Sequence, residues 1–460
     1  MDSLVTIVGA TGTGKSKLAV DLACRFNGEI INGDAMQMYR GLPIITNQIP
    51  IEERNGVPHH LISCIELEEE PWRVGLFKNE CLRLIKDVHA RGKLPILVGG
   101  THYYTQAVLF KDQLVGELAV DQEDGQSNGE TKDPSTKWPI LDASPDAVLQ
   151  KLREVDPVMA ERWHPNETRK IRRSLEIYFQ TGKPASEVYA AQKRAKQSPG
   201  SDGNSVGAAQ QLRFQTVILW VHSDKETLNT RLDKRVDAMI ADGLMSEAQQ
   251  MTNYLQEKKM QGVPVNHTRG VWISIGFKEL APYFEALYSN SLNENELEAL
   301  KRSCIEQVKI ATRQYSVSQI KWVRNKLWGA LAEAGMTHRL FLLDSTNVDH
   351  WVNCITEPSE LLVHSLLRNE PTPDPKSLSD LARNILGAKE AQSPRSGPRC
   401  ITCDICKKTM INQEQWEIHI KGQVHRRILK SAAQKAHRDE YLRKQQNALE
   451  KNIDHRGIDG

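Results

Sequence analysis

Gly9-Ala-Thr-Gly-Thr-Gly-Lys15-Ser16 follows directly on a short apolar run, Leu4-Val-Thr-Ile-Val8. The run is typical of a buried strand, and Lys17 to Ala23 has the apolar spacing of a helix. A G-x-x-x-x-G-K-S match between a strand and a helix predicts a phosphate-binding loop, because glycines let backbone N–H groups surround an oxyanion. Lys15 would neutralise a phosphate, and the Ser16 hydroxyl would reach Mg²⁺. A glycine-rich turn of structural use alone is the weaker alternative.

Length and composition indicate a globular chain of two or three domains. It has 460 residues, of which 39% are hydrophobic and 26% charged. No run of about 18 apolar residues is present, so we expect no membrane contact, and we also expect no signal peptide ahead of the first strand. The eight cysteines are scattered except for the last three, which favours a reducing compartment with one metal site over a disulfide framework. We expect a cytoplasmic monomer, and the sequence does not separate mitochondrial and nuclear pools from the cytoplasmic one.

Apolar runs alternate with helical patterns in the first 110 residues, which predicts a parallel α/β sheet. The expected fold is a P-loop parallel sheet core with a helical insertion and a small C-terminal zinc finger. The insertion is bounded by polar stretches at 117–137 and 193–204, and such insertions usually carry substrate recognition. The expected strands cover 4–8, 28–33, 94–98, 215–221 and 339–343. The expected domains are a P-loop core (1–111 and 206–366), a helical insertion with flexible flanks (112–205), a linker (367–398), and a zinc finger with a basic helix (399–445).

Near the C-terminus, Cys403-x₂-Cys406-x₁₂-His419-x₅-His425 matches the C₂H₂ zinc-finger template in ligand type and spacing. Zinc takes four such ligands in a tetrahedron, so we expect a structural Zn²⁺ site. From residue 399 to the end there are thirteen Lys and Arg against eight Asp and Glu, whereas the whole chain carries only +2. One finger covers about three base pairs, so it is weak as a DNA reader. An accessory grip on RNA phosphates fits the basic residues better, and a merely solvated charged helix is the alternative.

Asp34 follows the second expected strand, and Thr101 follows the third. In a doubly wound sheet, ligands collect at the carboxyl ends of the strands, so Lys15, Asp34 and Thr101 should converge on one cleft. The third strand ends in Gly-Gly-Thr101 where a nucleotide hydrolase would be expected to carry an acidic residue for Mg²⁺. Asp34 is therefore the obvious carboxylate of this cleft, unless it is a surface residue of a turn.

These residues and several further strings resemble the tRNA dimethylallyltransferase (isopentenyltransferase) family, collinearly over about residues 3–328. The appended finger is similar to that of eukaryotic members. The strings are the loop, Ile31-Asn-Gly-Asp34-Ala-Met-Gln37-Met-Tyr, Pro58-His-His-Leu-Ile, Pro95-Ile-Leu-Val-Gly-Gly-Thr101, His164-Pro-Asn-Glu-Thr-Arg169, Thr181-Gly-Lys-Pro184, Arg231-Leu-x-x-Arg235-Val, Ile275-Gly-Phe-Lys-Glu279 and Thr312-Arg-Gln-Tyr315.

The resemblance implies that the dimethylallyl group moves from dimethylallyl pyrophosphate to N6 of the adenosine just 3′ of the anticodon in tRNA (position 37). It implies that Asp34 takes the proton of the adenine amine and that Thr101 positions the reactants. Lys15, an arginine from the pair Arg231 and Arg235, and Mg²⁺ held through Ser16 would stabilise the leaving pyrophosphate. The residues expected to bind pyrophosphate are Gly9, Thr11, Gly12, Thr13, Gly14, Lys15 and Ser16.

The same resemblance implies a tRNA surface. The adenosine must be splayed out of its loop to reach the cleft. Residues expected to contact tRNA are Asp34, Ala35, Met36, Gln37 and Thr101 at the base, and Arg169, Lys170, Arg172 and Arg173 on the insertion. Two departures limit the analogy: Val317 and Ser318 stand where the family usually has a basic pair, and Ala35 where serine is common.

Two other functions remain open at this point. A P-loop kinase for a nucleotide or small molecule would share the phosphate loop, although the chain lacks an acidic strand end and an obvious arginine-rich lid. A non-catalytic RNA-binding relative would keep the fold and the finger. Val317 and Ser318, which replace the usual basic pair, leave this alternative open.

Overall fold

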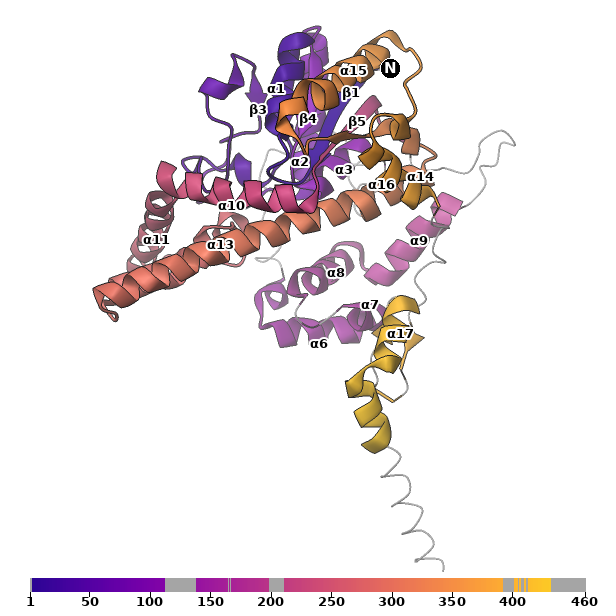
Figure 1. Cartoon of the computed structure of the whole chain (residues 1–460). Helices are drawn as coiled ribbons and strands as arrows, with labels where there is room; N and C mark the ends of the chain where they lie inside the picture. Colours follow the sequence, from indigo (N-terminus) through magenta and orange to yellow (C-terminus); the bar gives the residue numbers. More distant parts are fainter. Residues whose placement is uncertain are drawn as a thin grey trace, which may run out of the picture. The chain divides into compact units, whose positions relative to one another are not determined.

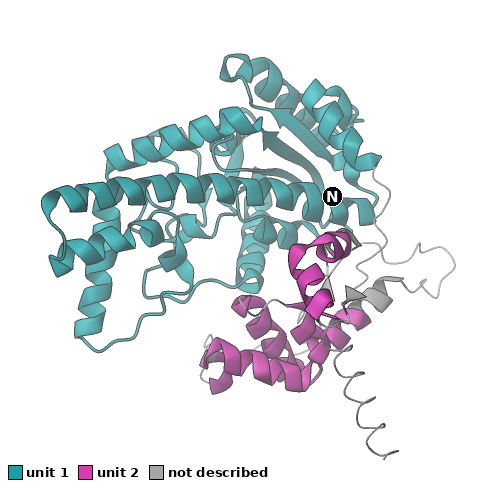
Figure 2. Cartoon of the chain, turned by 60° about the horizontal axis from the view of Figure 1, so that its bottom comes forward, with its two compact units in different colours: residues 1–117, 196–391 teal, residues 118–195, 392–460 magenta. Residues whose placement is uncertain are grey.

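The structure, a computed structural model, describes residues 2–111, 138–163, 165, 167–197, 211–391, 401–403, 405–406, 409–410 and 413–431. The chain divides into two compact units (Figure 2). The first combines residues 1–117 with 196–391, and the second combines 118–195 with 392–460. Most of the predicted polar flanks of the insertion lie outside the described residues, except that 193–197 continue a helix.

The first unit is built on a six-stranded sheet whose paired strands are all parallel, with the order β3-β2-β4-β1-β5-β6. Strands β1, β3, β4 and β5 are labelled in Figure 1. Val5 of the central strand lies opposite Ile96 on one side and Val217 on the other. The five predicted strands are found, and the short β3 was missed because two histidines form no apolar run. The strands are β1 (Ser3–Gly9), β2 (Gly28–Asn32), β3 (His59–His60), β4 (Leu94–Val98), β5 (Gln215–His222) and β6 (Leu340–Asp344).

Helices cover both faces of this sheet, which explains why its strands are apolar without alternation. On β1, Val5 and Ile7 pack with α1 and α15, whereas Leu4 and Val8 belong to the core that α2, α3 and α10–α13 close. The helices are α1 (Lys15–Arg25), α2 (Val74–Ala90), α3 (His102–Leu109), α10 (Lys225–Asp242), α11 (Leu244–Met260), α12 (Phe277–Ser289), α13 (Glu294–Trp322), α14 (Trp328–Glu333), α15 (Glu357–Arg368) and α16 (Asp380–Glu390).

The described part of the insertion is helical, as predicted. A buried aspartate, Asp156, ties its helices together: one carboxylate oxygen accepts from Met159 N at 3.1 Å and the other from Ser186 N at 2.8 Å. This side chain therefore caps one helix and holds the start of another. The helices are α6 (Pro145–Val155), α7 (Pro157–Arg162), α8 (Thr168–Thr181) and α9 (Ala185–Gln197).

The C-terminal module contains a two-stranded antiparallel hairpin, β7 (Ile401–Thr402) and β8 (Thr409–Met410), followed by α17 (Gln413–Lys421). Residues 423–431 are also helical. The module was predicted to continue to residue 445, and its part beyond residue 431 lies outside the described residues.

The linker predicted over 367–398 is wrong for its described part. Residues 380–390 form α16, in which Ala382 and Leu386 are fully buried in the core of the first unit. The Ser379 hydroxyl caps this helix by accepting from Ala382 N at 3.0 Å. The polar residues that suggested a linker occupy the preceding turn and the outer face, whereas Ala382 and Leu386, four residues apart, form an apolar inner face.

No helix among the described residues is long and apolar enough to cross a membrane.

If α16 belongs to the core, Leu386→Ala should destabilise the first unit by about 2–5 kcal/mol, because the side chain leaves a cavity when it is removed. The urea midpoint of tryptophan fluorescence measures this loss. Arg383→Ala, on the exposed side of the same helix, is the matched control and should cost less than about 1 kcal/mol. Equal midpoints for the two variants would restore the linker interpretation.

Candidate active site

The loop between β1 and α1 has the backbone geometry of an anion-binding turn. Gly9 and Gly14 have φ angles of +144° and +91°, where side chains are strained. A Cβ at Gly9 would also lie 2.3 Å from the carbonyl oxygen of Val221 on the neighbouring strand. Lys15 Nζ donates to the Ala10 carbonyl at 2.6 Å, and the Thr13 hydroxyl donates to the same oxygen at 2.9 Å. Both side chains thus hold the loop closed, while Ser16 is exposed.

Asp34 and Thr101 meet at the ends of two adjacent strands. Gly33 N donates to the Val98 carbonyl at 2.7 Å, which brings the turn after β2 onto the turn after β4. The Thr101 hydroxyl accepts from Ala35 N at 3.0 Å. A Cβ at Gly100 would lie 2.8 Å from Asp34 Oδ2, so the glycine is what makes room for the carboxylate. Since β4 also pairs with β1, both residues stand beside the phosphate loop.

The charges of this cleft influence one another. Burial raises the pKa of Asp34, against the hydrogen bond from Met36 N and the positive charges of Lys15 and Arg235. Burial lowers the pKa of Lys15 to about 7, against the attraction of Asp34. Burial also lowers the pKa of Arg235 to about 10, and Asp34 again opposes the shift. One carboxylate therefore shares the cleft with two cations, all with desolvated charges.

The two arginines of α10 are placed differently. Arg235 donates from Nη1 to the Thr11 hydroxyl at 2.8 Å and from Nη2 to Asn47 Oδ1, so its guanidinium lies at the loop. Arg231 donates to the carbonyls of Ser345 and Thr346, each at 2.7 Å. The guanidinium of Arg231 thus binds the backbone after β6. Unlike those of Arg235, these hydrogen bonds do not involve the phosphate loop.

Gln319 and Tyr315, four residues apart on α13, complete the cleft and were not predicted as site residues. The Gln319 amide accepts from Thr11 N at 2.8 Å and donates to the Gly100 carbonyl at 3.0 Å, which links the phosphate loop to the turn after β4. Burial and the charge of Asp34 raise the pKa of Tyr315, against hydrogen bonds with Gln319 and Thr101. The i, i+4 spacing of two polar residues at the end of a long helix was the available signal.

His102, directly after Thr101, was also missed. Its side chain is 5% exposed, and neither ring nitrogen has a hydrogen-bond partner among the described residues. Burial and, to a smaller extent, the charge of Lys15 lower the pKa of His102 to about 3. The imidazole is therefore neutral at physiological pH, so it adds no positive charge to the cleft.

The three residues expected at the target base follow Asp34 as a short helical turn. Ala35 precedes the 3-10 helix Met36–Met38, and all three are partly buried. The Gln37 amide donates to the Asn47 carbonyl at 2.8 Å, beside the contact of Arg235 with the same residue.

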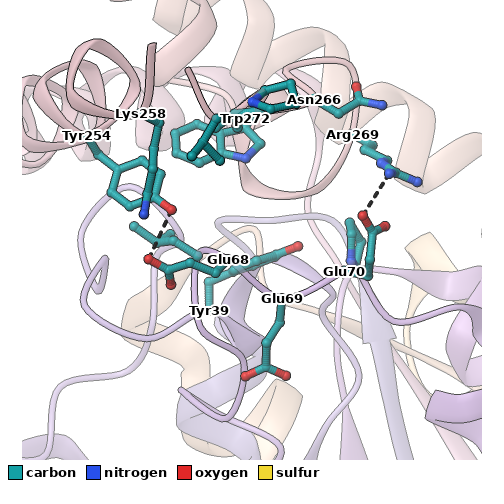
Figure 3. A pocket seen from close by; sticks show the side chains of 14 residues that line it. Tyr39, Glu68, Glu69, Glu70, Tyr254, Lys258, Asn266, Arg269 and Trp272 are labelled. Atoms are coloured by element: carbon teal, nitrogen blue, oxygen red, sulfur yellow. Dashed lines mark hydrogen bonds and ion pairs between the residues drawn. The ribbon is translucent and has the colours of Figure 1, made fainter. Parts of the chain in front are cut away.

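A pocket of about 170 Å³ lies elsewhere in the first unit (Figure 3). The Tyr254 and Trp272 rings stack in it at 5.6 Å, and Arg269 pairs with Glu70 at 2.7 Å. Its lining residues come from Tyr39, the segment 67–71, the end of α11 and the segment 263–272. None of the predicted site residues lines this pocket, so the predicted chemistry does not use it.

The basic cluster of the insertion lies on α8. Arg169, Lys170 and Arg173 are exposed, and Arg172 is partly buried. Arg172 and Arg173 both pair with Glu176, at 3.3 and 3.1 Å, and Lys170 pairs with Glu167. Three of the four charges are thus partly neutralised on their own helix, and no ion pair of Arg169 is found within the described part of the chain.

Cys403, Cys406, His419 and His425 gather at one point of the C-terminal module, with ligand atoms all within 4.8 Å of one another. His425 Nδ1 lies 3.3 Å from Cys406 Sγ and 3.1 Å from His419 Nε2. Cys406 N donates to Cys403 Sγ at 3.4 Å, as expected for a thiolate held in a knuckle. Two thiols and two imidazoles converging on one centre fit a tetrahedral zinc site.

Two family models match the chain. The model of IPP transferase matches residues 37–326, and that of a zinc-finger double-stranded RNA-binding family matches residues 400–426. The chain is 37% identical over 448 residues to the tRNA dimethylallyltransferase of Schizosaccharomyces pombe, covering 95% of this chain and 96% of the relative. It is 35% identical to the Homo sapiens tRNA dimethylallyltransferase over 431 residues, covering 93% and 86%.

The fold is similar to that of a solved eukaryotic dimethylallyltransferase acting on tRNA. The TM-score is 0.73 at 31% sequence identity, and the match covers 96% of this chain and all of the other. The likeness extends over the helical insertion and the finger as well as the sheet, because the coverage of both chains is nearly complete. The chain belongs to the IPP transferase family, as a tRNA dimethylallyltransferase of the eukaryotic type with a C-terminal zinc finger.

Proposed function

We propose that this chain transfers the dimethylallyl group from dimethylallyl pyrophosphate to N6 of adenosine 37 of tRNA. The observation that carries the proposal is that Asp34 lies within electrostatic reach of the cations Lys15 and Arg235 at the carboxyl ends of the inner strands. A diphosphate needs the cations, and an amine that becomes alkylated needs a base. A phosphate-loop kinase would be expected to hold Mg²⁺ at an acidic strand end, whereas β4 is followed by Gly-Gly-Thr.

The phosphate loop, residues Gly9 to Ser16, holds the diphosphate of the donor. Its N–H groups and the N-terminus of α1 face the oxyanions, and Lys15 and Arg235 neutralise their charge. Arg235 is the arginine assigned to this task, because the hydrogen bonds of Arg231 go to the Ser345 and Thr346 carbonyls. Arg231 therefore acts on the segment after β6 and not on the diphosphate.

The acceptor half of the reaction belongs to Asp34 and Thr101. The N6 amine attacks C1 of the dimethylallyl group, the C1–O bond breaks, and pyrophosphate leaves with the bonding electrons. One amine proton passes to Asp34, whose raised pKa makes it a stronger base than an exposed aspartate. Thr101 holds the turn that carries Asp34 through its hydrogen bond with Ala35 N. Gln319 links this acceptor side of the cleft to the phosphate loop through Thr11 N.

Magnesium fits this site through the chemistry of its donors. Ser16 is exposed at the start of α1 and directly follows Lys15, where phosphate-loop proteins hold Mg²⁺ through a hydroxyl. The ion would neutralise charge on the leaving pyrophosphate when bound.

The second unit supplies the tRNA contacts. Arg169, Lys170, Arg172 and Arg173 of α8 are proposed to meet phosphates, and the zinc finger to meet duplex RNA. Contacts of this kind fix the position of the RNA without reading its sequence. Arg169, Lys170 and Arg173 are exposed, and phosphates can compete with the carboxylates of Glu167 and Glu176 for Lys170 and Arg173. A monomer located in the cytoplasm remains our prediction.

The function is tested by incubating the purified protein with tRNA and dimethylallyl pyrophosphate, followed by mass spectrometry of the nucleosides. Asp34→Ala should lower the transfer rate about 10²–10⁴-fold, the usual contribution of a general base, while the tRNA dissociation constant changes less than about twofold. Asp87→Asn, an exposed carboxylate on α2, is the matched control and should transfer normally. An active Asp34→Ala variant would show that the base is misassigned.

The pKa shifts predict an asymmetric pH profile. Lys15 must be charged to grip the donor, and its pKa of about 7 in the free protein means that kcat/KM for dimethylallyl pyrophosphate falls as pH rises above about 7. Bound diphosphate favours the charged lysine, so kcat is flatter there. Lys15→Arg keeps its charge to much higher pH and should move the alkaline limb upward. A limb that stays at the same pH in this variant would exclude Lys15 as its cause.

Removal of zinc should weaken tRNA binding without changing donor binding in the first unit. We expect one zinc ion per chain by mass spectrometry, lost in Cys403→Ala and retained in the control Cys24→Ala, an exposed cysteine of the first unit. The variant without zinc should lose tRNA affinity at fixed salt, because zinc supplies about 10–16 kcal/mol of folding free energy to fingers. Donor binding in the first unit should not change. Full tRNA affinity without zinc would exclude the finger from the tRNA surface.

A further inference from the structure

The indole of Trp351 covers one side of the phosphate loop. An ideal Cβ on Gly14 would lie 2.4 Å from Trp351 Cη2 and 2.8 Å from Cζ3, so the six-membered ring rests directly against this glycine. The ammonium of Lys17 lies 5.6 Å from the centroid of the indole and 2.7 Å from Asp21 Oδ2. The ring therefore occupies the surface where the loop passes into α1.

Trp351 approaches from the side opposite to the acceptor residues. It follows β6, at one edge of the sheet, whereas Asp34 follows β2, and β1 with its loop lies between these two strands. A group bound in the loop can extend toward Asp34 or toward Trp351. The transferred dimethylallyl group must take the first direction, because the base stands there.

The segment that carries Trp351 is a fixed part of the fold. Arg231 donates to the Ser345 and Thr346 carbonyls at 2.7 Å each, and the Thr346 hydroxyl accepts from Asp224 N at 3.1 Å. Ser345 N also donates to the His222 carbonyl at 2.8 Å. The indole N–H is buried and has no hydrogen-bond partner among the described residues, so steric packing accounts for the position of the ring.

Loops of this sequence type bind nucleotides in many proteins, with the β-phosphate inside the loop and the α-phosphate near the start of the helix. The sugar and base then lie beside the residues that follow the loop lysine. In this chain that region is Lys17, and the Trp351 ring lies against Gly14 and beside the Lys17 ammonium.

We propose that Trp351 determines donor specificity by filling the space that the nucleoside of ATP or ADP would need. Arg231 is the positioning residue that holds its segment. Inorganic pyrophosphate and a short prenyl diphosphate carry no nucleoside and fit beneath the ring. Blocking a competitor is effective here because the loop binds the diphosphate shared by both ligand classes, and contacts with that group cannot separate them. The inference rests on the proposed diphosphate role of the loop.

The test measures inhibition constants of ATP, ADP and inorganic pyrophosphate, each with Mg²⁺, against dimethylallyl pyrophosphate in the transfer assay. Trp351→Ala should lower the constants for ATP and ADP at least tenfold and leave that for pyrophosphate within twofold. Trp351→Phe keeps a ring at the loop and should resemble the unmodified protein. Trp272→Ala, which removes an indole from the pocket of Figure 3, is the matched control and should leave the ratio of ATP to pyrophosphate constants unchanged.

The inhibition constant of pyrophosphate shows whether the loop still binds a diphosphate after the substitution. Equal changes for ATP and pyrophosphate in Trp351→Ala would make Trp351 a support of the loop and overturn the specificity role. Unchanged constants for both would overturn it as well. Failure of pyrophosphate to compete in the unmodified protein would instead reject the diphosphate role of the loop, and with it the proposed function.

Discussion

The active cleft depends on one electrostatic arrangement, a desolvated carboxylate between two desolvated cations. Lys15 lies at the end of the phosphate loop, Arg235 on α10 and Asp34 after β2, so three separate elements must be in register for these opposite charges to lie near one another. A buried charge without a partner is strongly unfavourable, and removal of Asp34 would leave two such cations. The sheet therefore has to hold the ends of β1, β4 and β2 together.

Close backbone approach is what allows that register. Gly99 lies so near Gly33 that a Cβ would be 2.2 Å from its carbonyl carbon, and Gly100 gives the same room to Asp34. The amide of Gln319 then joins the loop to the turn after β4 with one accepted and one donated hydrogen bond. Because Gln319 is 4% exposed, these bonds are shielded from water, and the long helix α13 becomes part of the site that it covers.

The sequence predicted those parts of the cleft that follow apolar strands. Asp34 and Thr101 could be assigned because ligands collect at the carboxyl ends of parallel strands. Gln319 could not be assigned, because it lies on a helix some 300 residues from the loop in sequence. No local pattern indicates that its amide binds Thr11 N and the Gly100 carbonyl. Nor could Arg231 and Arg235 be distinguished, since the backbone carbonyls that occupy Arg231 come from a turn without a motif. The helix α16 was missed because polar residues surround its two buried side chains.

In the reaction that we propose, the same three charges also couple proton transfer to the departure of pyrophosphate. Lys15, Arg235 and the ionised Asp34 together carry +1, which matches poorly with a leaving group that gains negative charge. If Asp34 accepts the amine proton, as we propose, the charge of the cluster rises to +2 while the negative charge on pyrophosphate increases. Proton transfer and departure of pyrophosphate therefore stabilise each other through space, and in a desolvated site this coupling is stronger than in water.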